Sequence, residues 1–282
     1  MTDSAWTFTA AFGGGGAAGA YEGVLVPRLF TPCAIALLAR LGLNPGETLL
    51  DVACGTGIVP RLAAPVLGPA GLVLARDLTE QMLEVARTVA LPPDSAPVEY
   101  GVAPADRLDA ADATVDVVTC QQGLQFFPDA PAAVGEMFRV LRPGGRAGIA
   151  VWRHIEECPF WAAAQVAATE HLDAERAALI TAPFRWPGED ALVDVLQGAG
   201  FRDVVVSTHS IVMHFELGMR HALTSLVATP LAAHLAALHS DAYEEFVHSA
   251  TRALGRSAAP DDAVDIPART LIATARRGAP LP

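Results

Sequence analysis

The feature that most constrains the fold of this chain is a short apolar run, residues 48–53 (TLLDVA), that leads directly into a loop containing Gly55 and Gly57. A run of this length and composition is typical of a buried strand, and the apolar spacing of residues 58–66 after the loop is helical. Glycines between a strand and a helix let the backbone turn sharply and approach a ligand closely. The segment therefore predicts the first strand and helix of an α/β sheet, with a binding site at the loop between them.

Strand and helix patterns continue to alternate beyond this loop. Such alternation implies a parallel sheet covered by helices on both faces, in which ligands bind at the carboxyl ends of the strands. The sequence therefore predicts an α/β fold, a Rossmann-like, doubly wound sheet of seven strands with an α-helical cap. Further strands are expected at 72–75, 98–102, 115–120, 146–152, 203–208 and 267–275, and further helices at 79–90, 130–141, 160–172, 189–199 and 216–255.

The N-terminal region has a composition of its own. Residues 13–20 (GGGGAAGA) are predicted to be flexible, and Pro27 and Pro32 are expected to divide residues 21–41 into two short helices. We divide the chain into an N-terminal helical cap segment, a ligand-binding core, and the rest of the core sheet with helical insertions over the substrate (1–45, 46–152 and 153–282).

Charge and cysteine content narrow the function classes. The net charge is −12, which argues against a nucleic-acid substrate and against docking on anionic membranes, because both need a basic surface. We find no apolar run of membrane-spanning length and no signal-peptide pattern, and the four cysteines form no CxxC pair. The histidines lack metal-ligand spacing. We therefore expect a cytoplasmic monomer or homodimer without a metal site, a membrane or a nucleic-acid partner.

The glycine loop has two interpretations. A nicotinamide dinucleotide site needs three glycines in the pattern G-x-G-x-x-G, but Pro60 stands at the third position here. An acidic residue, Asp51, precedes the loop, and a dinucleotide offers no cation for it to pair with. These residues argue against a dinucleotide site.

The segment LLDVACGTG resembles the first motif of class I S-adenosylmethionine-dependent methyltransferases. Further matches follow in the same order: Asp77 directly after the second strand, Ala105 after the third, and QQGLQFFPD with EMFRVLRPGG at and after the fourth. The last stretch is similar to small-molecule methyltransferases of the quinone-biosynthesis type. The resemblance covers about residues 45–152 and implies that residues 46–152 bind S-adenosylmethionine, whose product is S-adenosylhomocysteine.

The resemblance also implies roles for individual residues. It places Asp51 near the methionyl ammonium and Asp77 on both ribose hydroxyls. Pro104 stands where the family has an adenine-binding Asp, so Asp106, two residues further on, is the candidate replacement. The full set of implied cofactor-binding residues is Tyr21, Asp51, Ala53, Gly55, Gly57, Asp77, Leu78, Met82, Ala105, Asp106 and Gln121.

Methyl transfer leaves few catalytic residues to predict. The cofactor is already activated, so the protein chiefly has to align the acceptor, and a general base is needed only if the acceptor loses a proton. His154, after the fifth strand, is the candidate base, with His209 and His214 as weaker ones, and Gln122 lies beside the reactive methyl group. The other candidates for the acceptor pocket are Gln125, Phe126 and an aromatic wall of Trp152, Phe160 and Trp161.

These observations lead to one preferred function and two alternatives. We expect methyl transfer to an oxygen, carbon or nitrogen atom of an apolar small molecule, such as a quinone-like, polyketide or other secondary metabolite. In the first alternative the chain binds the cofactor structurally and catalyses a cyclisation or rearrangement. In the second it is a non-catalytic partner subunit of another methyltransferase.

Overall fold

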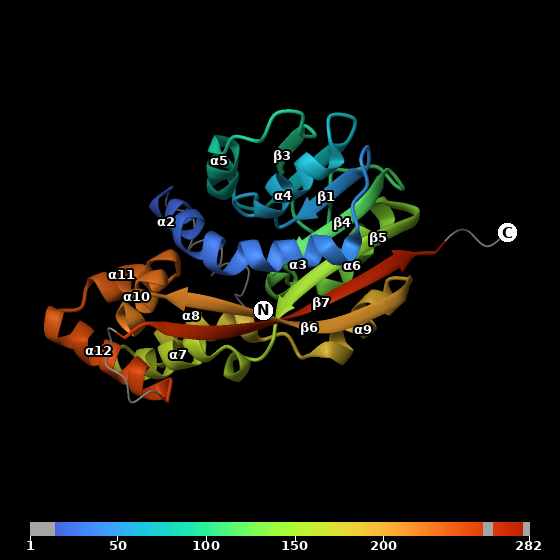
Figure 1. Cartoon of the computed structure of the whole chain (residues 1–282). Helices are drawn as coiled ribbons and strands as arrows, with labels where there is room; N and C mark the ends of the chain where they lie inside the picture. The colour runs from blue at the N-terminus through green and yellow to red at the C-terminus, as the bar shows by residue number, and fades with distance from the viewer. Residues whose placement is uncertain (1–14, 256–261, 279–282) are drawn as a thin grey trace.

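The computed structural model describes residues 15–255 and 262–278, and its centre is one sheet of seven strands in the order β3-β2-β1-β4-β5-β7-β6 (Figure 1). Strands β1 to β5 pair in parallel, whereas β7 is antiparallel to both of its neighbours. This confirms the predicted α/β class and the seven strands. Their bounds are β1 (Thr48–Val52), β2 (Leu72–Asp77), β3 (Val98–Val102), β4 (Val115–Gln121), β5 (Leu141–Trp152), β6 (Phe201–Phe215) and β7 (Val264–Arg277).

Helices cover both faces of this sheet. Leu49 of β1 belongs to the apolar cluster formed with the helices of one face, and the next residue, Leu50, belongs to the cluster of the other face. This alternation is what a buried strand requires, because successive side chains point to opposite faces. The first face carries α3 (Thr31–Leu41), α4 (Ile58–Leu67) and α5 (Glu80–Thr88), and the second carries α6 (Ala130–Val140) and α9 (Glu189–Gly198).

A helical cap lies beyond the edge of the main sheet. β6 and β7 continue as a two-stranded ribbon past Trp152, the last residue of β5 that pairs with β7. Ile211, Met213 and Phe215 of this ribbon are buried against the cap helices. The helices gathered at this end of the molecule (Figure 1) are α7 (Pro159–His171), α8 (Ala174–Thr181), α10 (Gly218–Thr224), α11 (Ala232–Ala236) and α12 (Ser240–Ala253).

The predicted division of residues 21–41 into two short helices is wrong. α2 (Gly15–Ala20), the π-helix η1 (Tyr21–Phe30) and α3 follow one another without a break. Pro27 lies inside η1, where the wider turn lets the Thr31 N–H reach the carbonyl of Val26. Residues 15–20 are helical rather than flexible, and residues 13–14 of that predicted stretch lie outside the described residues.

Other element bounds also differ from the prediction. β5 begins at Leu141 rather than at residue 146, because the chain enters the sheet as soon as α6 ends. β6 is longer than the predicted 203–208, since its second half pairs with β7 outside the main sheet. Residues 216–255 are not helical throughout. Three short helices (α10, η5, Ser225–Ala228, and α11) precede α12.

The continuous N-terminal helix is long and apolar enough, by length and composition, to span a membrane over Gly16–Leu41. Its environment gives another reason for this composition, because 56% of its most apolar window is buried inside the fold. Leu29 and Leu37 both belong to the core of the first face. The segment is therefore a core helix of this domain, which explains its apolar side chains.

We predict that Gly71→Ala destabilises the chain. A Cβ at Gly71 would lie 2.7 Å from Leu67 Cβ and 2.9 Å from the Glu47 carbonyl oxygen, so the start of β2 would have to shift. Overpacking of this kind typically lowers the free energy of unfolding by about 1–3 kcal/mol. Urea denaturation measures the change.

The control is Gly135→Ala in α6, where a Cβ would meet nothing within 4 Å. Ala is favoured over Gly inside a helix by roughly 0.8–1.0 kcal/mol, so this variant should be more stable than the wild type. Equal effects of the two substitutions would contradict the proposed packing at Gly71.

Candidate functional site

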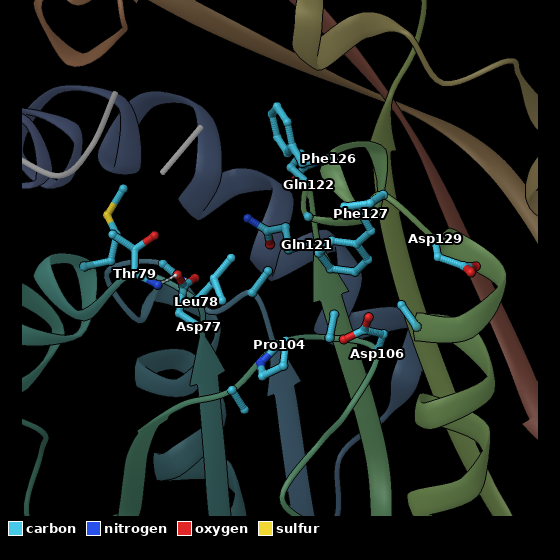
Figure 2. Close-up of a pocket in the computed structure, with 18 of the residues that line it drawn as sticks. Asp77, Leu78, Thr79, Pro104, Asp106, Gln121, Gln122, Phe126, Phe127 and Asp129 are labelled. Carbon is cyan, nitrogen blue, oxygen red and sulfur yellow. Dashed lines mark hydrogen bonds between the residues drawn. The ribbon is translucent and has the colours of Figure 1, made fainter. Parts of the chain in front are cut away.

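A cavity of about 220 Å³ opens at the carboxyl ends of β1, β2 and β4, where a ligand site was predicted (Figure 2). Such an edge is the usual binding place in a doubly wound sheet. The residues that line the cavity are Tyr21, Ala53, Gly55, Asp77, Leu78, Thr79, Met82, Ala103, Pro104, Ala105, Asp106, Gln121, Gln122, Gly123, Phe126, Phe127, Pro128, Asp129 and Ala133.

The glycine loop forms one wall of the cavity in an unusual backbone conformation. Ala53, Gly55 and Gly57 all have positive φ angles, of 58°, 55° and 85°. At Gly57 space is also restricted, because a Cβ there would lie 2.9 Å from the Tyr100 hydroxyl and 3.2 Å from Ala86 Cβ. Glycine is required at this position both by the backbone angle and by the close approach of β3 and α5.

Asp77 fixes this loop to the next strand. Its Oδ2 accepts a hydrogen bond of 2.8 Å from the Gly55 N–H, and its Oδ1 accepts one of 2.9 Å from the Thr79 N–H. The side chain is buried at the cavity wall, and this burial raises the pKa of its carboxyl group. One carboxylate thus positions both the loop after β1 and the turn that begins α5, and it lies at the wall of the cavity.

The β3 side of the cavity contains the residues predicted to contact adenine. Met82 is buried, Leu78 is 53% exposed, and Asp106 is exposed at the rim. Figure 2 shows Pro104 and Asp106 facing the same space as Leu78 and Asp77. The structure therefore brings these sequence-predicted residues together.

Gln121, the last residue of β4, and Gln122, which follows it, have different hydrogen-bond partners. Gln121 Nε2 donates to the Phe30 carbonyl (3.1 Å), and its buried Oε1 has no hydrogen-bond partner among the described residues. Gln122 Nε2 donates instead to Cys33 Sγ (3.2 Å) and to Thr270 Oγ1 (3.0 Å), so its carboxamide is bonded into the core. Gln122 nevertheless lines the cavity, with a φ of 50°, and its catalytic role stays a prediction.

Several predicted site residues do not line the cavity. Asp51 lies behind the glycine loop, where Thr119 Oγ1 donates a 2.6 Å hydrogen bond to it and burial raises its pKa to about 8. Gly57 belongs to the glycine loop but does not line the cavity. His154 is exposed at the start of the turn η3 (Ile155–Glu157), because the chain leaves the sheet directly after Trp152.

The weaker histidine candidates also lie elsewhere. His209 and His214 are on β6, and His214 Nδ1 is 2.6 Å from Asp265 Oδ1 on the neighbouring strand. Neither histidine lines the cavity. Among the residues that the structure describes, no group of three or more His, Cys, Asp or Glu side chains is arranged to hold a metal ion.

The wall of the cavity that follows β4 contains Phe126, a predicted pocket residue, and further residues up to Asp129 that were not predicted to line it. The turn η2 (Leu124–Phe126) and the residues up to the start of α6 close one side of the cavity, as Figure 2 shows for Phe127 and Asp129. Gly123 allows this turn, because a Cβ there would lie 2.6 Å from Ala53 Cβ. The glycine directly after a strand end was the available signal.

The N-terminal helix closes the cavity from above the glycine loop. Tyr21 lines the cavity, and its ring edge would lie 4.0 Å from a Cβ at Gly55. Glu22 Oε1 forms an ion pair with Arg61 Nη2 (2.7 Å), and Arg61 Nη1 donates to the Thr56 carbonyl. The helix is thus held against the same loop that Asp77 organises.

The aromatic residues predicted to form a wall of the acceptor pocket do not line the cavity, and they belong to a chain of ring contacts that leads from this helix into the cap. Phe30 lies 4.8 Å from Tyr21 and 6.0 Å from Trp152 between ring centroids. Trp152, Phe160 and Trp161 are all buried. Phe184 connects Trp152 to Trp161, and Trp161 packs edge-on against Phe160 at 4.9 Å.

Residues 50–149 match the family model described as a methyltransferase domain. The nocamycin O-methyltransferase of Saccharothrix syringae is 34% identical over 204 residues, which cover 66% of this chain and 70% of that protein. The ubiquinone/menaquinone biosynthesis C-methyltransferase of Ectopseudomonas mendocina is 40% identical over 106 residues, covering 37% of this chain and 41% of that protein.

A solved structure is similar over most of the chain. Phosphoethanolamine N-methyltransferase 2 of Haemonchus contortus, bound to phosphomonomethylethanolamine and S-adenosylhomocysteine, has a TM-score of 0.59 at 20% identity. The match covers 93% of this chain and 57% of that one, and it shows the shared fold.

We predict that Asp51 makes the stability of the ligand-free chain depend on pH. Its folded pKa of about 8 lies above the unfolded value near 3.9, so between these values the folded state holds a proton that the unfolded state releases. The free energy of unfolding should therefore fall as pH rises from about 4 to 8. Asp51→Asn, which cannot ionise, should reduce this fall, as measured by urea denaturation at several pH values. An identical pH dependence in the variant would refute the assignment.

Proposed function

Because the chain belongs to the class I S-adenosylmethionine-dependent methyltransferases, we propose that it transfers a methyl group from this cofactor to an oxygen, carbon or nitrogen atom of an apolar small molecule. S-adenosylmethionine is the cofactor of the family. The observation that carries the proposal is the cavity at the carboxyl ends of β1, β2 and β4, with the buried carboxylate of Asp77 beside the glycine loop.

The cavity residues fit this cofactor. Asp77 brings a carboxylate to the cavity wall, and each carboxylate oxygen can accept more than one hydrogen bond, which suits the ribose hydroxyls. Gln121 Oε1 is a buried acceptor without a partner among the described residues, and it suits the methionyl ammonium. The residues that would hold adenine are Leu78, Met82, Ala105 and Asp106. Ala53 and Gly55 would contact the cofactor through their backbone atoms, and Tyr21 would cover it.

Methyl transfer from this cofactor requires little of the protein beyond aligning the acceptor with the methyl group. The bound cofactor supplies a methyl group on a positively charged sulfur, and the leaving thioether is neutral. The chain has to exclude water and hold the acceptor atom at roughly 3–3.5 Å from that methyl group. Among the described residues that line the cavity there is no histidine, and Asp77 is already engaged by the backbone. We therefore expect that neither a histidine of the cavity wall nor Asp77 acts as a general base.

The surroundings of the cavity favour an apolar acceptor, and the nocamycin O-methyltransferase supports a role in secondary metabolism. The aromatic residues from Tyr21 to Trp161 form an uncharged surface beside the end of β4. All four cysteines are free and buried, which supports a reducing compartment such as the cytoplasm. A monomer or homodimer is the proposed assembly.

Isothermal titration with S-adenosylmethionine, S-adenosylhomocysteine and NADH tests the proposal. We expect micromolar binding of the two sulfur ligands and none of NADH. Formation of S-adenosylhomocysteine in step with product supports methyl transfer, whereas turnover without it supports the cyclisation or rearrangement. Absence of binding of both sulfur ligands would contradict the proposal and favour the partner-subunit alternative.

We predict that Asp77→Asn weakens S-adenosylmethionine binding. The substitution removes the charge that strengthens hydrogen bonds from the ribose hydroxyls, a loss of about 1.5–3 kcal/mol. This corresponds to an increase in Kd of roughly ten- to a hundred-fold in isothermal titration.

The control is Asp112→Asn, which removes the same charge from a 77% exposed side chain that pairs with Arg139. Its cofactor affinity should equal that of the wild type. Thermal melts check that both variants are folded, and unchanged affinity in a folded Asp77→Asn variant would remove the ribose assignment.

A further inference from the structure

Three buried polar atoms near the end of β4 and the start of the cap have no hydrogen-bond partner among the described residues. They are the Oε1 atoms of Gln121 and Gln125 and the Nε1 atom of Trp161. Buried side-chain polar atoms normally have a partner, so each such atom calls for an explanation. Gln121 is accounted for by the cofactor in the proposed function, which leaves one acceptor on Gln125 and one donor on Trp161.

These two atoms flank the same structural element. Gln125 lies in η2, and η2 packs against η4 (Ala182–Phe184). The ring of Phe184 lies 5.9 Å from that of Trp161, between centroids. η4 therefore contacts Trp161 through Phe184 and packs against η2, the turn that carries Gln125.

A series of ring contacts connects this place with the wall of the cofactor cavity. Phe126, next to Gln125, lines the cavity, and Trp152 joins Phe184 to Phe30 and so to Tyr21. The rings along this path carry no charge and pack against one another.

The fold satisfies equivalent atoms elsewhere. Trp186 is as buried as Trp161, with exposed fractions of 9% and 8%, yet its Nε1 donates a 3.0 Å hydrogen bond to the Gly188 carbonyl. Gln125 Nε2 donates to the Gln122 carbonyl (3.0 Å), and this bond fixes which end of the amide is left without a partner. The two unpartnered atoms thus form a complementary donor and acceptor at an otherwise apolar wall.

We propose that Trp161 and Gln125 determine acceptor specificity by binding an uncharged, planar conjugated molecule. Its carbonyl oxygen accepts a hydrogen bond from Trp161 Nε1–H, and its hydroxyl or N–H group donates one to Gln125 Oε1. The aromatic path binds the planar part. This inference rests on the proposed function, because it assigns the acceptor side of the same site. Since side chains enclose both atoms in the structure, the acceptor reaches them by parting η2 from the cap.

Three small probes separate the two hydrogen bonds. Umbelliferone has a carbonyl and a hydroxyl group, its methyl ether herniarin lacks the donor, and β-naphthol lacks the carbonyl. Their binding is measured by isothermal titration in mildly acidic buffer, which keeps umbelliferone neutral, to protein saturated with S-adenosylhomocysteine. We expect umbelliferone to bind the wild type most tightly.

The first variant is Trp161→Phe, which keeps an aromatic ring and removes the N–H group. It should weaken binding of umbelliferone and herniarin by about three- to ten-fold, as expected for one neutral hydrogen bond, and leave β-naphthol unchanged. The matched control, Trp186→Phe, removes an indole N–H that is already bonded within the core of the opposite face. It should leave all three affinities unchanged.

The second variant, Gln125→Met, has a side chain of similar length without the acceptor. It should weaken umbelliferone and β-naphthol by a similar factor and leave herniarin unchanged. This pattern is opposite to that of Trp161→Phe, so a general loss of packing cannot produce both.

Three outcomes would overturn the inference: no probe binds the wild type, Trp161→Phe weakens all three probes equally, or Trp186→Phe has the same effect as Trp161→Phe. Binding of S-adenosylhomocysteine, measured first in the same samples, keeps the two proposals apart. Its failure counts against the proposed function, whereas its success without probe binding counts only against the acceptor assignment.

Discussion

The structure of the site depends on one buried carboxylate. Asp77 accepts hydrogen bonds from the backbone of the loop after β1 and from the turn after β2, which brings two separate segments to the same edge of the sheet. Burial would favour the neutral form of a carboxyl group, and the two N–H donors act against this effect by stabilising the charge. A carboxylate that both organises the loop and lies at the cavity wall is suited to binding the hydroxyl groups of a ligand.

The remaining walls come from segments that are distant in sequence. The N-terminal helix covers the loop through Tyr21 and the Glu22–Arg61 ion pair, and η2 closes the side next to β4. The β6–β7 ribbon extends the sheet into a platform for the cap helices, so the aromatic path from Tyr21 to Trp161 crosses from core to cap. The proposed cofactor site and the proposed acceptor site therefore involve different layers of one continuous core.

Sequence reasoning succeeded where the signal was local. The alternation of strands and helices, the glycine loop and Asp77 all lie where they were predicted. It failed where a long-range contact decides the outcome. Pro27 predicted a break between two helices. The segment instead packs on the sheet and stays helical, because the wider turn of a π-helix accommodates the proline. His154 lies two residues after the end of β5, yet its side chain is exposed to solvent.

The sequence by itself determined the order of elements, the family and the cofactor, because periodicity and the glycine motif are properties of neighbouring residues. Only the tertiary structure decided how two adjacent glutamines are hydrogen-bonded. Gln122 is bonded to Cys33 and Thr270, which lie 89 and 148 residues away, whereas the amide oxygen of Gln121 has no partner among the described residues. Whether a buried polar atom has a partner depends on what the fold brings against it, and no local pattern records that.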